Sequence, residues 1–281
     1  MCGTVGFRPD DIVVGTYAKS GTTWTQQIVA QLLFDGAEDL AVAEMSPWLD
    51  LRVPPSEFKL AALEAQMHRR FIKTHLPVDA LVYSPTAKYI YIGRDGRDVI
   101  WSMHNHWING NATIYAAVND TPGRVGPLFE RPPASAREYF LTWLEHDGYP
   151  FTSANLWENV RSWWAIRELP NLLLLHFEHL KADMPGEIRR IADFLGVRID
   201  PVKWPAILEH CSFDYMKAHP TRSVPLGGAF WDGGAATFIH KGINGRWRNE
   251  LSERDCRLYE ATARRELGEA CAYWLATGRE S

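Results

Sequence analysis

Short apolar strands alternate with helical segments along this 281-residue chain, and this alternation constrains the fold more than any other feature. Runs of apolar and β-branched residues predict four buried strands, at residues 11–16, 70–73, 88–93 and 171–176. Strands that alternate with helices form a mostly parallel sheet covered by helices on both faces. Because no internal repeat, linker or shift in composition divides the sequence, we predict one α/β domain over residues 1–281.

Helical spacing of apolar residues predicts the elements between these strands. The predicted helices cover residues 22–34, 57–68, 135–147 and 155–168, and two more begin near Gly96 and at Asp183, the latter ending at Gly196. Either Thr22 or Thr23 is expected to cap the first helix. Two stretches rich in Gly and Pro lack such spacing, so residues 109–134 predict a long loop and residues 220–236 a candidate lid.

The first predicted strand runs directly into a polar turn, Tyr17-Ala-Lys-Ser-Gly-Thr-Thr-Trp24, which opens a helix. Backbone N–H groups and the dipole at a helix start attract anions, Lys19 adds a full positive charge, and Gly21 allows close approach. Hydroxyl donors come from Ser20, Thr22 and Thr23. An ordinary turn is the alternative, but five consecutive residues of phosphate-binding type favour a phosphate loop.

This turn differs from the P-loop motif of ATPases, because its Lys precedes the Gly. A carboxylate ligand for Mg²⁺ is hard to place, because Asp95 follows the third strand only after Arg94, a better partner for phosphate than for Mg²⁺. We therefore predict no metal. The turn alone predicts phosphate binding and no more.

Composition excludes several other classes of function. The net charge is −4, which argues against nucleic-acid binding through bulk charge. The four cysteines, Cys2, Cys211, Cys256 and Cys271, have no metal-ligand spacing, and we expect reduced thiols. Neither a signal peptide nor a membrane-length apolar stretch is recognisable, so we predict a cytoplasmic protein without nucleic-acid or membrane partners.

The turn from Tyr17 to Trp24 resembles the 5′-phosphosulfate loop of the cytosolic sulfotransferase family, whose donor is 3′-phosphoadenosine 5′-phosphosulfate (PAPS). Three further segments resemble that family's motifs in the same order. They are Arg70-Phe-Ile-Lys-Thr-His-Leu-Pro77, the segment Tyr89-Ile-Tyr-Ile-Gly-Arg-Asp-Gly-Arg-Asp-Val-Ile-Trp-Ser102, and Phe238-Ile-His-Lys-Gly-Ile-Asn-Gly-Arg-Trp247. The resemblance covers residues 12–248, nearly the whole chain.

The resemblance implies sulfuryl transfer to a hydroxyl, for which positioning and charge stabilisation matter most. His75 is the candidate general base, Lys19 faces the leaving group and Lys73 the sulfuryl group; a structural His75 bonded to a carbonyl is the alternative. The residues expected to hold PAPS, or its product adenosine 3′,5′-bisphosphate (PAP), are Lys19, Ser20, Gly21, Thr22, Thr23, Trp24, Arg94, Ser102, Phe177, Phe213, His240, Lys241 and Gly242. Trp24 is expected to stack on adenine, unless it is a core residue.

Several positions depart from the family pattern. His240 replaces the Arg that usually precedes Lys-Gly, which weakens one expected 3′-phosphate contact. Phe177 replaces a Tyr, and Cys211 a Thr. The family's dimer motif is not recognisable after Arg248, so the oligomeric state stays open. The other arginines of these motifs, Arg97, Arg246 and Arg248, are interpreted as solvated or structural.

The acceptor is expected to be a small, largely apolar or aromatic molecule with a hydroxyl group. Candidate acceptor-pocket residues are Trp48, His104, Trp107, Trp143, Phe151 and Trp231, each with a plain core position as its alternative. The helix after Gly96 carries a polar pair, His104 and His106, which lines this pocket or a solvated face. Two other functions remain open: a nucleotide-dependent kinase and a non-catalytic nucleotide-binding protein.

Overall fold

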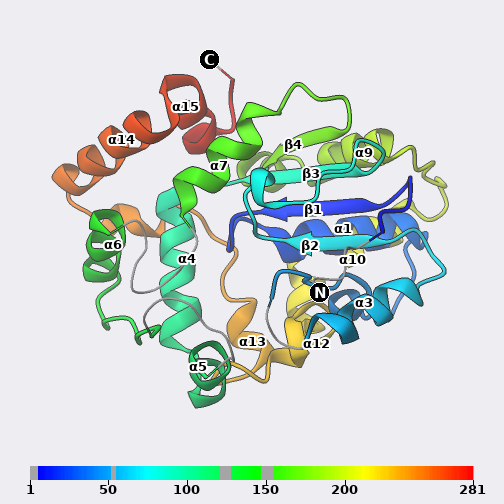
Figure 1. The fold of residues 1–281 in the computed structure, drawn as a ribbon, viewed down its shortest axis with the longest axis horizontal. Helices are drawn as coiled ribbons and strands as arrows, with labels where there is room; N and C mark the ends of the chain where they lie inside the picture. The colour runs from blue at the N-terminus through cyan, green and yellow to red at the C-terminus, as the bar shows by residue number, and fades with distance from the viewer. Residues whose placement is uncertain (1–5, 52–54, 121–127, 147–154, 281) are drawn as a thin grey trace.

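A four-stranded parallel sheet forms the centre of the part of the chain that the structure describes (Figure 1). The structure is a computed structural model, and it describes residues 6–51, 55–120, 128–146 and 155–280. The strands lie in the order β2-β1-β3-β4. They are β1 (Ile12–Thr16), β2 (Phe71–Thr74), β3 (Lys88–Gly93) and β4 (Leu172–His176). This arrangement confirms the predicted α/β class and all four predicted strands, within one residue at each end.

Helices surround the sheet. The longer helices are α1 (Thr22–Leu33), α3 (Ser56–Glu64), α4 (Gly96–Ile108), α5 (Ala112–Asn119), α6 (Ala136–Glu145), α7 (Leu156–Ala165), α9 (Met184–Leu195), α10 (Trp204–His210), α14 (Glu253–Leu267) and α15 (Glu269–Thr277). Shorter turns of helix are α2 (Val42–Met45), η1 (Val78–Ala80), α8 (Phe177–Ala182), α11 (Phe213–Ala218), α12 (Pro220–Ser223), η2 (Pro225–Gly228), α13 (Ala235–Phe238) and η3 (Arg246–Asn249).

The two faces of the sheet bury different side chains, because successive residues of a strand point to opposite faces. On one face Tyr89 and Tyr91 pack against helix residues such as Trp163 of α7 and Trp274 of α15. On the other face the alternate strand residues, among them Ile90, pack against α1, α9 and α10. Both faces are therefore covered, which explains why the strands are continuously apolar.

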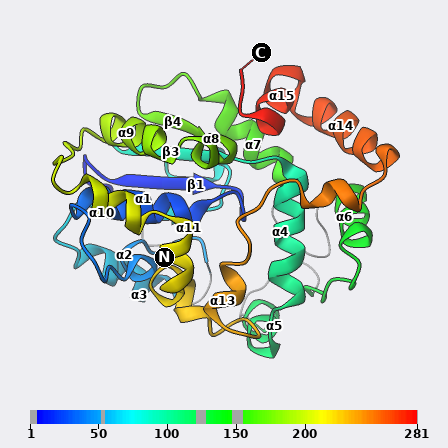
Figure 2. The same ribbon diagram turned by 180° about the vertical axis from the view of Figure 1, so that it is seen from behind.

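Helix α4 lies beyond one end of the sheet and runs across the direction of the strands (Figures 1 and 2). It begins where β3 ends, and Asp95 caps it by accepting a hydrogen bond from Arg97 N. The segment after Pro220 packs against the carboxyl end of α4 and the start of α5. Trp231 Nε1 donates to His106 O at 3.2 Å, and Asn111 N donates to Phe230 O at 3.1 Å. The ends of α4 and α5 and residues 220–239 thus form a wall opposite the sheet.

Three local predictions are corrected. The first helix is preceded by Gly21, and no side chain of Thr22 or Thr23 caps it, because Thr22 is already its first residue. Helix α5 lies inside the predicted loop 109–134, where Asn111 caps it with bonds to two backbone N–H groups. Residues 220–236 are likewise not irregular throughout, since α12 and η2 form there; movement of a lid stays a prediction. Asp183 caps α9 and Gly196 ends it, as predicted.

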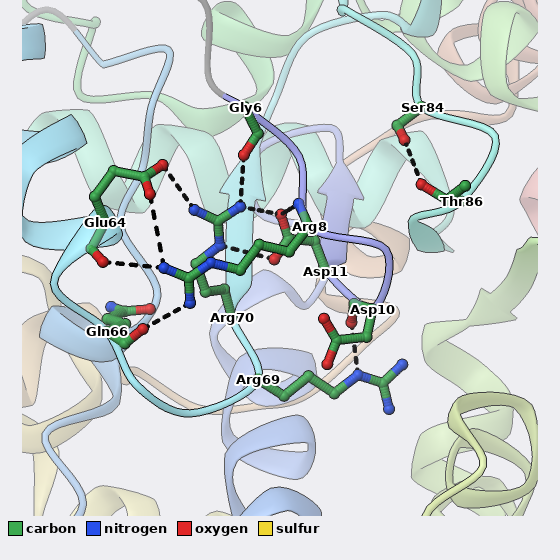
Figure 3. A network of polar contacts seen from close by, with 10 residues as sticks. All are labelled: Gly6, Arg8, Asp10, Asp11, Glu64, Gln66, Arg69, Arg70, Ser84 and Thr86. Atoms are coloured by element: carbon green, nitrogen blue, oxygen red, sulfur yellow. Dashed lines mark hydrogen bonds and ion pairs between the residues drawn. The ribbon is translucent and has the colours of Figure 1, made fainter.

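A network of ion pairs ties the amino ends of the two neighbouring strands together (Figure 3). Arg70, just before β2, donates from Nε to Asp11 Oδ1 at 2.8 Å and also pairs with Asp11 Oδ2. Its Nη1 pairs with Glu64 at 2.9 Å, and its Nη2 donates to Gly6 O at 2.8 Å. Both Arg70 and Asp11 are fully buried, so each depends on the other for the interactions that water would otherwise supply.

Candidate active site

A cavity of about 1070 Å³ opens at the carboxyl ends of the strands, between the sheet and the wall formed by α4 and residues 220–239. Each strand is followed by a residue that borders it: Lys19 after β1, His75 after β2, Arg94 after β3 and Phe177 after β4. Ligands of open parallel sheets collect at this edge. Four segments far apart in the sequence therefore meet at one site.

The loop between β1 and α1 has the backbone shape of an anion site. Lys19 and Gly21 both have positive φ, 68° and 118°, which turns the chain sharply into the helix. A side chain at position 21 would place its Cβ 2.9 Å from the Phe177 ring, so only glycine fits there. Thr22 borders the cavity beside them, but Ser20 is buried and does not. The prediction of a direct Ser20 contact is therefore not supported by this geometry.

Three cations at the carboxyl ends of the strands border the cavity, and none of the three forms an ion pair among the described residues: Lys19, Lys73 and Arg94. Loss of hydration, followed by repulsion from Lys73 and Arg94, lowers the pKa of Lys19 to about 7. Burial lowers the pKa of Lys73 to about 8, although Asp50 attracts it. Buried positive charges that repel one another favour the binding of an anionic ligand.

Arg94 is fixed by its neighbours rather than by a carboxylate. Its Nη1 donates to Lys19 O at 2.9 Å, and its Nε donates to Asn244 Oδ1 at 3.0 Å. The guanidinium carbon lies 4.3 Å from the centre of the Phe177 ring. Arg94 therefore connects the phosphate loop, α8 and the segment before η3, and it reaches the cavity in a defined orientation.

His75 is held in one tautomer. Its Nδ1 lies 2.9 Å from Thr16 O, and because a carbonyl only accepts, Nδ1 carries the proton and Nε2 has a free lone pair. Its own backbone is fixed at N by Asp50 at 3.0 Å and at O by Asn159 at 2.9 Å. Burial, then the charge of Lys73, lowers the His75 pKa well below 6.5. The imidazole is therefore neutral at pH 7 and able to accept a proton.

The remaining nucleotide-site candidates apart from Ser20 also border the cavity. Trp24 is half-buried, borders the cavity and donates from Nε1 to Cys211 O at 2.8 Å, which fixes the plane of its indole. The other candidates are Thr23, Ser102, Phe177, Phe213, His240, Lys241 and Gly242. Gly242 has a φ of 59°, and a Cβ there would come within 2.7 Å of the Phe213 ring. The structure brings these residues together from α1, α4, α8, α11 and the segment after α13.

The acceptor-pocket candidates divide into two groups. Trp48, Trp107 and Trp231 border the cavity. Trp143 and His104 do not, which corrects their prediction. Trp143 is buried in the core of α6 against Trp157. His104 Nε2 bonds to Pro133 O at 2.8 Å, on the side of α4 that faces α6. Phe151 lies outside the described residues.

His106 is the functional candidate that the sequence left open between pocket and solvated face, and it borders the cavity. Its Nδ1 lies 3.5 Å from Lys19 Nζ, and its ring packs against Trp231 at 4.9 Å and Phe238 at 5.8 Å. It stands four residues after Ser102, and residues four apart share a helix face. That spacing separates His106 from His104 and was available in the sequence.

Arg246 is a second cavity residue that the sequence analysis did not assign to the site. It borders the cavity, a position that the sequence interpretation as solvated or structural did not anticipate. Arg97 and Arg248 fit that interpretation: Arg97 pairs with Asp95 at 2.7 Å, and Arg248 is exposed against Trp247.

The described residues contain neither a cluster of metal ligands nor a membrane-spanning helix. No group of three or more His, Cys, Asp or Glu side chains in the described ranges is placed to hold a metal ion. No helix in that part of the chain is long and apolar enough to cross a membrane. Cys211, Cys256 and Cys271 are free thiols.

Known structures share this fold. Retinol dehydratase in complex with androsterone and the inactive cofactor PAP superposes with a TM-score of 0.67 at 25% identity, covering 94% of this chain and 82% of that protein. Mouse sulfotransferase SULT7A1 complexed with PAP has a TM-score of 0.73, covering 96% of this chain and 90% of that protein. Its identity is 19%, so that likeness concerns the fold alone.

Sequence comparisons agree. The chain is 33% identical to a glycolipid sulfotransferase of Mycobacterium bovis, over 90% of this chain and 83% of the relative. It is 32% identical to mouse sulfotransferase 1B1, over 92% and 83%. Residues 9–270 match the sulfotransferase domain family. The predicted reaction class is thereby confirmed, and the chain belongs to the sulfotransferase family.

Proposed function

We propose that this chain transfers the sulfuryl group of PAPS to a hydroxyl of a largely apolar small molecule, with His75 as general base. One observation carries the proposal: three cations at the strand ends, none of them in an ion pair among the described residues, border the same cavity as one neutral, oriented imidazole. The cations suit a donor with several negative charges, and the imidazole suits an acceptor that must lose a proton. Residues 9–270 match one family domain, which supports a single domain.

The residues present fit PAPS. The loop from Lys19 to Thr23 offers an ammonium, hydroxyls and a backbone turned by positive φ to the 5′-phosphosulfate. Trp24 and Phe213 offer flat aromatic faces to adenine from opposite ends of the sequence. Arg94, Ser102 and Lys241 also border the cavity, and we assign their two charges and one hydroxyl to the second phosphate. Retinol dehydratase, described above, was solved with PAP, which supports the same nucleotide here.

The reaction follows from the positions of these side chains. His75 Nε2 accepts the proton of the acceptor hydroxyl while the acceptor oxygen forms a bond to sulfur. The bond between sulfur and the oxygen of the 5′-phosphate breaks, and its electron pair leaves with PAP. Lys19 stabilises charge on that oxygen, and Lys73 stabilises charge on the sulfuryl oxygens. The Thr16 carbonyl, 2.9 Å from His75 Nδ1, stabilises the imidazolium that forms.

Aromatic side chains indicate the acceptor class. Trp48, Trp107 and Trp231 border the cavity, and Phe58, Ile114 and Leu226 add apolar surface. A glycolipid sulfotransferase is among the relatives, and retinol dehydratase was solved with retinol or androsterone. These support an acceptor with one hydroxyl at His75 and a large apolar body. Incubation with labelled PAPS and a panel of phenols, alcohols, sterols and glycolipids tests the proposal, and no labelled product from any acceptor would contradict it.

Binding measurements separate the alternatives. A sulfotransferase binds PAP in preference to ATP, with or without Mg²⁺, whereas a clear preference for Mg·ATP would support a kinase. A non-catalytic binding protein would bind PAP but give no product with any acceptor. Location in the cytoplasm stays a prediction, and the oligomeric state stays open.

A further inference from the structure

The arginine at position 246 stands on the cavity wall near the position where the sequence departs from its family. The family's Arg before Lys-Gly is replaced by His240, so one expected cation at the 3′-phosphate is missing. We propose that Arg246 supplies this missing cation and binds the 3′-phosphate of the nucleotide. The inference rests on the proposed function, because it assumes that the nucleotide carries a 3′-phosphate.

The backbone around Arg246 is fixed against the phosphate side of the site. Gly245 has a φ of 76°, and its N–H donates to Asp98 Oδ1 at 2.7 Å, which anchors the turn to α4. Asn244 Oδ1 accepts from Arg94, and Asn244 Nδ2 donates to Glu178 Oε1 at 2.6 Å. The turn is therefore held to α4, to Arg94 and to α8 by the two residues just before Arg246.

The next residue, Trp247, fixes the turn on the carboxyl side of Arg246. It is buried, and the guanidinium carbon of Arg97 lies 4.0 Å from the centre of its ring. With Gly245 and Trp247 both fixed, little freedom remains for the backbone of Arg246. Because its backbone is already fixed, the Arg246 side chain loses less conformational entropy when its guanidinium binds a ligand.

Charges around Arg246 point to an anionic ligand. Arg246 forms no ion pair among the described residues, and its Nη1 lies 3.3 Å from His240 Nδ1. Burial lowers the pKa of Arg94, and repulsion from Arg246 adds to this effect against the attraction of Asp98. Two guanidinium groups that repel each other across a cavity wall are stabilised together by a phosphate dianion.

His240 acts here as a positioning residue. Burial, then repulsion from Arg246 and Lys241, lowers the His240 pKa, so its imidazole is neutral at pH 7 and Nδ1 accepts from Arg246. A neutral acceptor orients the guanidinium without cancelling its charge. Arginine is suited to this role, because its planar fork contacts two phosphate oxygens at once.

The test compares two nucleotides that differ by one phosphate. Calorimetry measures binding of PAP and of adenosine 5′-monophosphate to wild type, to Arg246→Gln and to Arg248→Gln. Arg248 is the matched control, because it is exposed and stacks on the outside of Trp247. We expect Arg246→Gln to weaken PAP binding about 10- to 100-fold, as for a lost charge-assisted contact, with unchanged binding of the monophosphate. Arg248→Gln should leave both unchanged.

A double variant separates loss of the contact from damage to the fold. His240→Arg in the Arg246→Gln background restores the family's arrangement and should recover most of the lost PAP affinity. Unchanged PAP affinity in Arg246→Gln, or an equal loss for both nucleotides, would overturn the inference while wild-type PAP binding keeps the proposed function intact. If the wild type binds no PAP, the proposed function itself fails.

Discussion

The two ends of strand β2 carry buried cations in opposite situations. At the amino end, Arg70 is fully buried but paired with Asp11 and Glu64 (Figure 3). At the carboxyl end, Lys73 is buried, lies 4.2 Å from the centre of the Trp48 ring and forms no ion pair among the described residues. Lys19 and Arg94 continue this pattern on the neighbouring strands. Charge at the amino end thus stabilises the fold, whereas charge at the carboxyl end is available to a ligand.

Burial changes the pKa of the two side chains in opposite directions. The pKa of Lys73 falls to about 8, because burial removes water and Asp50 compensates only partly. The pKa of Arg70 rises instead, because hydrogen bonds to Asp11 outweigh the loss of water. A side chain whose charged form is destabilised by the fold is a candidate for function, and one whose charged form is stabilised is a candidate for structure.

The largest effect is expected at His75. Replacing His75 by Ala removes the proton acceptor and should lower kcat by a factor of about 10² to 10⁴. Binding of PAP should change little, since the free Nε2 faces the acceptor. His104→Ala is the control, because His104 lies on the far side of α4 and bonds to Pro133 O. Turnover of His75→Ala within threefold of wild type would remove it from the mechanism.

Matched substitutions on β2 test the contrast between its two ends. Arg70→Met leaves Asp11 buried without its counter-ion and should lower the free energy of unfolding by about 3–5 kcal/mol. Lys73→Met removes a buried charge without an ion-pair partner, so stability should stay equal or rise while turnover falls sharply. Denaturant unfolding and initial rates measure both. Equal destabilisation by the two substitutions would mean that the ends do not differ.

The pH dependence of PAP binding follows from the two lysines. In the free protein the pKa values of Lys19 and Lys73 are about 7 and 8, and bound phosphate raises them. Above these values binding must take up protons, so affinity falls as pH rises from 7 to 9, by up to about tenfold per unit for each lysine. The phosphates, with a second pKa near 6, are already dianionic in this range.

Calorimetry at pH 8 in buffers of different ionisation enthalpy checks this by counting protons. Net uptake is expected for wild type and less uptake for Lys73→Met. Affinity that is constant from pH 7 to 9 would show that the cations at the carboxyl ends are fully charged before the ligand binds.

The smallest effect is expected at His106. The contact between His106 Nδ1 and Lys19 Nζ is long, at 3.5 Å, and the ring sits among aromatic side chains. His106→Phe keeps the packing and removes the acceptor for Lys19, so kcat should fall by less than about tenfold with PAP affinity unchanged. A loss as large as that of His75→Ala would make His106 a second essential group.

Much of this site could be predicted from the sequence because it follows local rules. The residues after each strand carry the cations, the base and one aromatic ring, and strand ends are readable from apolar runs. Trp143 and Trp48 show the limit. Both are tryptophans near polar residues, yet Trp143 is core and Trp48 lies 4.7 Å from the His75 ring. Only the path of the chain between elements decides that, and composition contains no such information.

Longer-range contacts explain the other misses. Arg246 was interpreted as solvated or structural because nothing in its own segment indicates that Gly245 binds Asp98, 147 residues earlier. Helix α5 was missed because its eight residues lie in a stretch rich in Asn and Gly, and its cap at Asn111 was not weighed against them. The position of His106 at the cavity, by contrast, could have been predicted from the sequence, because it stands four residues after Ser102 on the same helix face.

The central position of β1 has a consequence for partial folding. Because β1 pairs with both β2 and β3, the phosphate loop lies between two strands that the chain adds 55 and more residues later. A contiguous fragment that holds Lys19, His75 and Arg94 must span β1, β2 and β3, and the nucleotide-site candidates Phe213 and Lys241 extend the cavity lining beyond β4. PAP therefore binds the complete native state and should stabilise it by mass action, which makes protection from proteolysis by PAP an assay of correct assembly that needs no acceptor.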